Sequence, residues 1–186
     1  MPNCDAGLVS VLMSVYNGAP TLEKAAASVL AQTYRDLELI LCDDASTDDT
    51  WRIMQRIAAQ DARVTIFQNK TNLGLGASLN ECLARAQGAY IARQDADDVS
   101  DSDRIERTMD FLLSSGAPYA ACGVRVFDDT GVWSTRQFPQ KITKHIIAQK
   151  NPFFHPTMLF RRAVLESVNG YSTSPETRRT EDYDLV

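Results

Sequence analysis

Residues 89–98 read Ala89-Tyr-Ile-Ala-Arg-Gln-Asp-Ala-Asp-Asp98, a short apolar run that ends abruptly in carboxylates. The apolar part follows Gly88 and predicts a buried strand of about five or six residues. Asp95, Asp97 and Asp98 lie so close in sequence that they repel one another unless protons or a cation intervene. Oxygen ligands favour a hard ion over zinc, so the segment predicts a site for Mg²⁺ or Mn²⁺. A solvated acidic loop is the alternative interpretation.

Three further apolar segments precede this strand and alternate with amphipathic stretches. Leu8–Val15 is nearly all apolar, as expected for a strand that is covered on both faces, and Leu37–Cys42 and Val64–Phe67 are predicted as the second and third strands. Stretches with helical spacing of apolar residues occupy the intervals, and the last of them covers Ser78–Ala86. This alternation predicts an α/β fold with a mostly parallel, doubly wound sheet flanked by helices.

Polar residues follow the ends of the first, second and fourth predicted strands. Tyr16-Asn17, Asp43-Asp44 and the acidic triplet take these positions. Right-handed crossovers place the carboxyl ends of parallel strands at one edge of the sheet, where the ligands of such folds bind. We therefore expect these side chains to converge although they are far apart in the sequence.

The second half of the chain is expected to add a smaller antiparallel region. A helix capped by Ser102 or Asp103 is predicted to run through Ser114. Tyr119–Phe127 is predicted as one strand that turns through Asp128-Asp-Thr-Gly131 into a second strand. The patterns then predict a helix, a strand and a short helix over Lys141–Lys150, Thr157–Phe160 and Arg161–Val168. No linker interrupts the 186 residues, so one domain is expected.

The composition excludes several classes of protein. A net charge of -5 gives no support for a nucleic-acid surface, which would be basic. The four cysteines match the spacing of neither a zinc site nor a compact disulfide framework, so reduced thiols are expected. No apolar run approaches the roughly 18 residues that cross a bilayer, and the start resembles no signal peptide. We expect a soluble cytoplasmic protein, with peripheral association at the inner face of the membrane and the oligomeric state left open.

Five short motifs follow one another along the chain: Val9-Ser-Val-Leu-Met-Ser-Val-Tyr-Asn17, Asp43-Asp-Ala-Ser-Thr-Asp48, Asn72-Leu-Gly74, Asp95-Ala-Asp-Asp98 and Glu181-Asp182. In this order they resemble the family 2 glycosyltransferases, which are inverting enzymes of the Rossmann-like GT-A fold that use nucleotide-diphosphate sugars. The resemblance implies a single GT-A domain in which residues 1–98 bind the nucleotide sugar and residues 99–186 form the acceptor side. The chain stops in what resembles an uncapped opening helix, so we expect the acceptor side to be truncated at the C-terminus.

The resemblance implies a nucleotide-sugar site built from the first four motifs. Tyr16 would lie against the nucleobase, and Asp43 would accept the imino N–H of uracil or thymine, with Asp44 beside it. A helix cap or a loop hydrogen bond is the alternative role for Asp44. The implied nucleotide-sugar-binding set is Ser14, Tyr16, Asn17, Asp43, Asp44, Asn72, Gly74 and Asp97. The metal set is Asp95, Asp97 and Asp98, and the sequence leaves open which of these acids binds Mg²⁺ or Mn²⁺.

The resemblance also implies residues for the transfer step. Asp182 matches the general base that takes the proton of the acceptor hydroxyl as it attacks the anomeric carbon. Its alternative role is that of an acid stabilising a helix N-terminus. Glu181 and His155 are weaker acceptor-side candidates, and a structural role is the alternative for His155. Arg178 and Arg179 either reach diphosphate oxygens or form a solvated basic pair.

Two positions depart from the pattern of the family. Leu79 stands where arginine is common, which calls into question a phosphate or base contact from that position, and Ser14 stands where proline is frequent. The resemblance implies inverting transfer from a nucleotide-diphosphate sugar, with UDP favoured, to a hydroxyl of a carbohydrate or glycolipid acceptor in polysaccharide or glycolipid synthesis. The alternative function is a nucleotide-binding module without transfer activity of its own.

Overall fold

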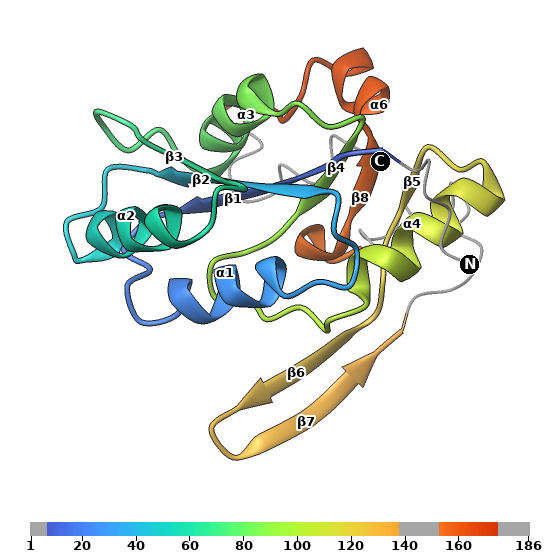
Figure 1. Ribbon diagram of the computed structural model, residues 1–186, viewed down its shortest axis with the longest axis horizontal. Coiled ribbons are helices and arrows are strands. Elements are labelled where there is room, and N and C mark those ends of the chain that lie inside the picture. The colour runs from blue at the N-terminus through green and yellow to red at the C-terminus, as the bar shows by residue number, and fades with distance from the viewer. Residues whose placement is uncertain (1–6, 138–152, 175–186) are drawn as a thin grey trace.

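The computed structural model describes residues 7–137 and 153–174 (Figure 1). In the first part, strands and helices alternate in the order β1 (Val9–Val15), α1 (Leu22–Leu30), β2 (Leu37–Asp43), α2 (Thr50–Gln60), β3 (Val64–Gln68), α3 (Leu75–Arg85) and β4 (Tyr90–Arg93). There follow α4 (Arg104–Ser115), β5 (Tyr119–Ala120), β6 (Val124–Asp128), β7 (Gly131–Arg136), the short 3-10 helix η1 (His155–Thr157), β8 (Leu159–Arg161) and α6 (Arg162–Ser167). The predicted α/β class is confirmed.

One mixed sheet organises the fold. Its strand order is β3-β2-β1-β4-β8-β5, while β6 and β7 form a separate two-stranded sheet. β3, β2, β1 and β4 are parallel, and β8 runs antiparallel to its neighbours β4 and β5. The chain progresses outward from β1 to β3 and then crosses to the other side of β1. The strand order therefore reverses between β1 and β4, which is where sheets of this kind bind their ligands.

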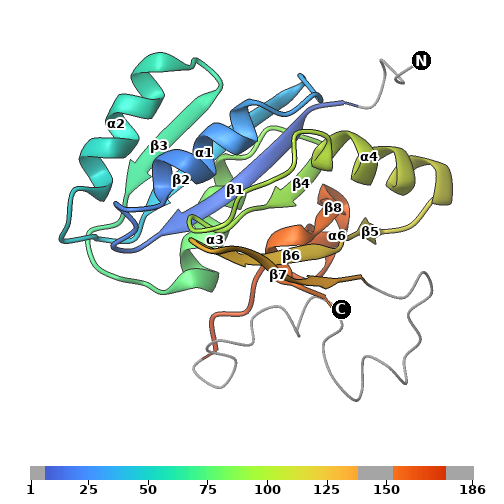
Figure 2. The same ribbon diagram turned by 90° about the horizontal axis from the view of Figure 1, so that it is seen from below.

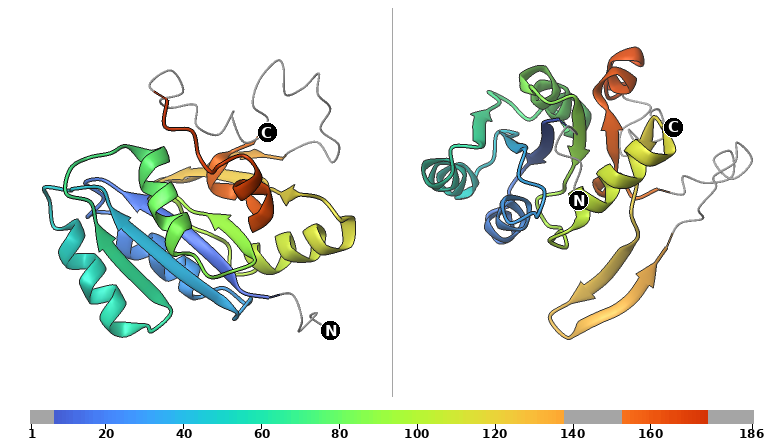
Figure 3. Two further views of the ribbon diagram at one scale, coloured as in Figure 1. Left: turned by 90° about the horizontal axis from the view of Figure 1, so that it is seen from above. Right: turned by 45° about the vertical axis from the view of Figure 1, so that its right-hand side comes forward.

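Side chains alternate between the two faces of the sheet along the central strands, and an apolar layer forms on each face. Val11 and Met13 of β1 pack with α1, α2 and α4 on one face. Leu12 points the other way and packs with α3 and α6. The views from below (Figure 2) and from above (Figure 3) show these two sets of helices on opposite faces of the sheet. Among the described helices, none combines the length and the hydropathy needed to cross a membrane.

The prediction of a single strand over Tyr119–Phe127 is wrong, because the chain changes sheets within it. β5 pairs with β8 in the main sheet, and β6 pairs with β7 in the hairpin that extends past α1 (Figure 1). Gly123 lies between β5 and β6, and its backbone passes close to the end of β7. A Cβ on Gly123 would lie 2.7 Å from the carbonyl oxygen of Arg136. Such a change of partner leaves the apolar pattern of the segment intact, so the pattern did not reveal it.

Three other boundaries differ from prediction or fall outside the described residues. α3 begins at Leu75 and not at Ser78, because Gly74 adopts a φ of 86° and lets the chain enter the helix early. The predicted strand Thr157–Phe160 is divided between η1 and β8, so the strand itself starts at Leu159. The predicted helix Lys141–Lys150 lies outside the described residues.

Gly88 fits against β1 with no room for a side chain. A Cβ at this position would lie 2.5 Å from the carbonyl oxygen of Leu8 and 2.8 Å from the backbone nitrogen of Ser10. We expect Gly88→Ala to lower the free energy of unfolding by about 3 kcal/mol, because the backbone of β1 cannot move without disturbing the sheet. Urea denaturation followed by circular dichroism measures this loss.

Gly116→Ala is the matched control for that variant. Gly116 has a φ of 67°, but a Cβ there would meet nothing within 4 Å. Backbone strain alone should then cost about 1–2 kcal/mol. Equal losses in the two variants would show that the contact with β1 is not the reason that glycine is needed at position 88.

Candidate functional site

The loops that follow β1 and β4 meet at the point where the strand order reverses. A Cβ built on Gly18 would lie 3.8 Å from the Cβ of Ala96, which separates Asp95 from Asp97. Tyr16, two residues before Gly18, has 53% of its surface exposed. The structure thus brings the aromatic tip of β1 next to the acidic loop after β4, as the strand-end argument predicted.

Asn17 joins the tip of β1 to the loop after β2. Its backbone N–H donates to Ser46 Oγ at 2.8 Å, and its side-chain Oδ1 accepts the backbone N–H of Thr47 at 2.8 Å. Asn17 holds a φ of 53°, a conformation that asparagine tolerates better than most residues. Within the structure, this predicted nucleotide-sugar residue therefore shapes the loops around the site.

Asp43 ends β2 as a fully buried carboxylate. Its Oδ1 accepts the backbone N–H of Ser46 at 2.9 Å, and its Oδ2 accepts the side-chain amide of Gln68 at 2.7 Å. Gln68 is the last residue of β3 and lies opposite Asp43 in the register of the sheet. The Gln68 amide thus presents to Asp43 the same kind of N–H donor that the resemblance assigned to a nucleobase.

Asp44 holds the glycine-bearing loop before α3. Its Oδ1 accepts the backbone N–H of Leu73 and the side-chain amide of Asn69, at 2.9 and 2.8 Å. Its Oδ2 accepts the backbone N–H of Gly74 at 2.9 Å. These contacts correspond to the loop-hydrogen-bond alternative for Asp44. The same loop carries Asn72, which is exposed.

The acidic loop after β4 is held from below by Gln94. The side-chain Nε2 of this buried residue donates to the carbonyl oxygens of Asp95 and Asp98 at 3.2 and 3.0 Å, and its Oε1 accepts the hydroxyl of Ser100 at 2.6 Å. The Arg93 guanidinium pairs with the carboxylate of Asp95, whose side chain is 33% exposed. Asp97 and Asp98 are exposed residues, although the carboxyl group of Asp98 is partly desolvated. The loop therefore presents three carboxylates on a fixed backbone.

The charge on this loop is not fully compensated. Desolvation of the Asp98 carboxyl, followed by the charges of Asp95 and Asp97, raises the pKa of Asp98 to about 6. Within the described residues, no three His, Cys, Asp or Glu side chains converge closely enough to hold a metal ion by themselves. Carboxylate oxygens are the donors that a hard cation prefers, and the remaining ligands of such an ion would have to come from a bound molecule, such as a diphosphate.

His155 is half-buried behind the acidic loop, with its Nε2 shielded from solvent. Burial, followed by the charge of Arg93, lowers the pKa of His155 to about 3, so its imidazole is neutral at pH 7. Its ring stands 5.3 Å from that of Tyr171, between centroids. Such a half-buried, uncharged ring matches the structural alternative for His155 better than a role in proton transfer.

The remaining candidate site residues lie either in the sheet and its helices or outside the described residues. Ser14 is half-buried in β1, opposite Cys42 of β2. Leu79 is fully buried in the apolar layer around α3, so this chain makes no phosphate contact from the position where arginine is common. The acceptor-side candidates Glu181 and Asp182, and the arginine pair before them, lie outside the described residues.

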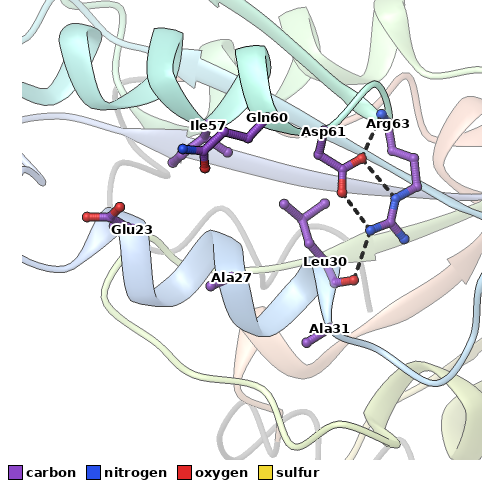
Figure 4. A pocket seen from close by; sticks show the side chains of 8 residues that line it. All are labelled: Glu23, Ala27, Leu30, Ala31, Ile57, Gln60, Asp61 and Arg63. Carbon is purple, nitrogen blue, oxygen red and sulfur yellow. Dashed lines mark hydrogen bonds and ion pairs between the residues drawn. The ribbon is translucent and has the colours of Figure 1, made fainter.

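A groove between α1 and α2 is lined by none of the predicted site residues (Figure 4). It has a volume of about 400 Å³ and mixed lining, with the Arg63 guanidinium donating to the carbonyl oxygen of Leu30 and pairing with Asp61. Arg63 precedes β3 and thus lies at the amino edge of the sheet. The end of the groove at Arg63 is therefore remote from the strand ends that carry the acids.

Sequence reasoning missed the side chains that support the acids. Gln68 and Gln94 hold Asp43 and the acidic loop, and two buried arginines, Arg93 and Arg104, lie behind that loop. One signal was available for Arg93. A charged residue inside an apolar strand, two positions before an aspartate, points to the same side of the strand as that aspartate and can pair with it.

Comparison with known proteins places the chain in one family of sequences. Residues 10–168 match the sequence model of Glycosyl transferase family 2. The chain is 45% identical over 179 residues to EpsE of Bacillus subtilis (strain 168), a protein assigned as a glycosyltransferase; the alignment covers 95% of this chain and 64% of EpsE. It is 34% identical over 131 residues to WfaP of Escherichia coli, named as a UDP-Glc:alpha-D-GlcNAc-diphosphoundecaprenol beta-1,3-glucosyltransferase, with 69% of this chain and 51% of WfaP covered. The chain thus spans less than two thirds of either relative.

Solved structures share the fold at lower identity. TarS 1-349 of S. aureus in complex with UDP superposes with a TM-score of 0.74 at 22% identity, covering 94% of this chain and 52% of that chain. The mannosyltransferase PcManGT from Pyrobaculum calidifontis in complex with GDP-Man and Mn²⁺ gives 0.71 at 23% identity, covering 89% and 48%. The predicted GT-A fold is confirmed by these likenesses.

We expect Asp44→Asn to loosen the loop before α3. An asparagine can accept hydrogen bonds at one of the two oxygen positions only, so at least one buried N–H donor loses its partner. The loss should be about 2–3 kcal/mol in the free energy of unfolding. Hydrogen exchange should speed up at the amides of Leu73 and Gly74. The control is Asp49→Asn, since Asp49 is exposed and makes no side-chain hydrogen bond to its helix. Equal exchange rates at Leu73 and Gly74 in both variants would show that Asp44 does not hold this loop.

We expect Asp98→Asn to stabilise the metal-free protein as the pH rises. The pKa of Asp98 is raised from 3.8 to about 6 in the folded state, so the protonated form contributes stability below 3.8 and this contribution is lost as the pH rises through 6. Asparagine does not ionise, so the variant does not lose this stability as the pH rises. Because the side chain reaches solvent, the gain relative to the native chain should stay below about 1 kcal/mol. Thermal melts in EDTA at either end of this range measure it, and a pH-independent difference would contradict the assignment.

Proposed function

The chain belongs to glycosyl transferase family 2, and we propose that it is a metal-dependent, inverting glycosyltransferase that uses a nucleotide-diphosphate sugar, with UDP favoured. One observation carries the proposal. The loop with Tyr16, the end of β2 with Asp43 and the acidic loop after β4 form a continuous rim where the strand order reverses. The proposal assigns to that rim a stacking surface at Tyr16, an N–H acceptor at Asp43 and a cation site at the acidic loop.

In this proposal, residues 1–98 bind the donor. The exposed ring of Tyr16 stacks on the nucleobase. Asp43 accepts the imino N–H of uracil, which requires the Gln68 amide to give up its present hydrogen bond to this carboxylate. The preference for UDP is supported by two similar proteins. WfaP, which is 34% identical to this chain, is named for UDP-Glc, and TarS was solved with UDP. Asn17 and Asp44 hold the loops on either side of the base.

Asp95, Asp97 and Asp98 hold the divalent ion and the sugar-diphosphate in this proposal. When bound, Mg²⁺ or Mn²⁺ stabilises the negative charge that develops on the leaving diphosphate. Desolvation first, and the charges of Asp95 and Asp97 second, raise the pKa of Asp98, and a bound cation would favour its ionised form. The likeness to PcManGT, which was solved with GDP-Man and Mn²⁺, agrees with this assignment.

The acceptor side is proposed to lie in residues 99–186. Asp182 takes the proton of the acceptor hydroxyl as that oxygen attacks the anomeric carbon, and inversion follows from attack opposite the leaving group. We propose a glycolipid acceptor, because the name of WfaP includes a diphosphoundecaprenol-linked sugar. An acceptor with such an anchor lies at a membrane surface, so the protein would associate with the membrane peripherally.

Thermal-shift titrations with UDP, GDP and TDP, each with and without Mn²⁺, test the proposal. A ligand that binds only the folded state at about 100 times its Kd adds about 2.7 kcal/mol of stability. For a chain of this size that corresponds to a rise of about 5–10 °C in Tm. We expect UDP with Mn²⁺ to give the largest rise. No Mn²⁺-dependent shift with any of the three nucleotides would contradict the proposal.

Two variants separate binding from transfer. Asp97→Ala should lose the part of the shift that depends on Mn²⁺, whereas Asp49→Ala, an exposed acid at the start of α2, should retain it. Asp182→Asn should keep the UDP shift and abolish transfer, because a base acts in the chemical step. A native chain that binds UDP but releases none from any UDP-sugar would instead be a nucleotide-binding module.

A further inference from the structure

Arg93 places a positive charge inside an otherwise apolar strand. It is the last residue of β4 and the largest fully buried side chain among the described residues. Its backbone is fixed on both sides, since its N–H donates to the carbonyl oxygen of Met158 and its Cα lies opposite that of Leu12. Burying a guanidinium costs several kcal/mol unless partners compensate it, so the partners of Arg93 matter.

The outer side of the guanidinium faces the acidic loop. Nη1 donates to the carbonyl oxygen of Gln94, and Nη2 donates to Oδ1 of Asp95. The side chain of Asp95 is one-third exposed, so its carboxylate has the guanidinium on one side and solvent on the other. Arg93 therefore fixes both the backbone leading into the loop and the first carboxylate of the loop.

The inner side of the guanidinium faces groups that carry no charge at neutral pH. His155 is neutral because burial and the charge of Arg93 lower its pKa to about 3, and burial raises the pKa of Tyr171. Within the described part of the chain, Nε of Arg93, Nε2 of His155 and the Tyr171 hydroxyl have no hydrogen-bond partner. The charge of Arg93 is consequently compensated from the side of the acids alone.

A second buried arginine keeps the end of β4 in place. Nη1 of Arg104, from the first turn of α4, donates to the carbonyl oxygens of Arg93 and Pro156 at 3.1 and 2.9 Å. It thereby ties the last residue of β4 to the turn that carries His155. The Arg93 side chain thus projects from a backbone that α4, β1 and the segment before β8 hold together.

We propose that Arg93 is a positioning residue of the donor site, whose buried guanidinium holds the Asp95 carboxylate in the orientation in which the acidic loop binds its divalent ion. The inference rests on the proposed function. Residues that hydrogen-bond to a metal-binding side chain orient it, and their replacement typically lowers metal affinity about 10- to 100-fold. A purely structural arginine would affect folding stability without changing the dependence on metal.

The test compares Arg93→Met with Arg161→Met by titrating Mn²⁺ into protein and UDP under calorimetry. Methionine preserves much of the length of arginine but neither pairs with Asp95 nor donates to Gln94. We expect Arg93→Met to need at least about tenfold more Mn²⁺ for half-maximal UDP binding. Its affinity for UDP in EDTA should stay within about twofold of native. Arg93→Lys, which keeps the charge but not the two-pronged geometry, should fall between the native chain and Arg93→Met.

Arg161 is a suitable control because it is a half-buried arginine of the same sheet without a carboxylate partner in the described residues. Its guanidinium donates to the carbonyl oxygens of Ala117 and Leu112. Arg161→Met should therefore lower Tm but leave the Mn²⁺ dependence of UDP binding unchanged. An equal change in the two methionine variants would overturn the inference, since it would reflect general loosening of the sheet.

A second readout needs no metal. In EDTA, the destabilisation caused by Arg93→Met should be smaller in an Asp95→Asn background than in the native one, because the lost pairing is then already absent. If Arg93→Met does not fold, Arg93→Lys is carried through both measurements. If a folded Arg93 variant keeps the native Mn²⁺ dependence of UDP binding, the inference about Arg93 is overturned while the proposed function stands. A native chain without Mn²⁺-dependent UDP binding would overturn the proposed function instead.

Discussion

Four parallel strands end at the same edge of the sheet, and the backbone groups released there must find hydrogen-bond partners. Much of the site follows from this constraint, because the described loops at that edge contain no helix or strand that would pair these groups. The partners are side chains: Asn17 for the loop after β2, Asp44 for the loop before α3, and Gln94 for the loop after β4. Hydrogen bonds thus join the loops after β1, after β2 and before α3, and Gln94 holds the loop after β4 through a separate set.

These hydrogen bonds divide the acids into two groups with different tasks. Asp43 and Asp44 are buried and use both carboxylate oxygens to accept N–H groups from the loops and from Gln68 and Asn69. The triplet after β4 is held mainly through its backbone and through Arg93, so its carboxylates face outward. Three like charges on one short loop are tolerated because two guanidinium groups lie behind them. A cation in front of them completes the compensation in the proposed function.

The sequence predicted the parallel half of the fold well, because each buried strand and amphipathic helix there has a local pattern. It failed where the chain changed partners without changing its pattern. Tyr119–Phe127 alternates like one strand but serves two sheets, and the start of α3 moved to Leu75 because Gly74 tolerates a positive φ. Within the site, the strand-end residues were predicted from topology. The residues that hold them, Gln68, Gln94 and Arg104, carry no local signal, since their partners are set by tertiary packing.

By itself, the sequence determined the class of fold, the edge at which polar residues gather and the family to which the chain belongs. Periodicity and the order of motifs are properties of the chain alone, and the handedness of crossovers converts them into a common edge. Only the tertiary structure decided what each polar residue does there. Burial and the nearest donor separate a carboxylate that supports a loop, such as Asp44, from one that remains open to a ligand, such as Asp97. Those two quantities arise from contacts between segments that are distant in sequence, so no local pattern encodes them.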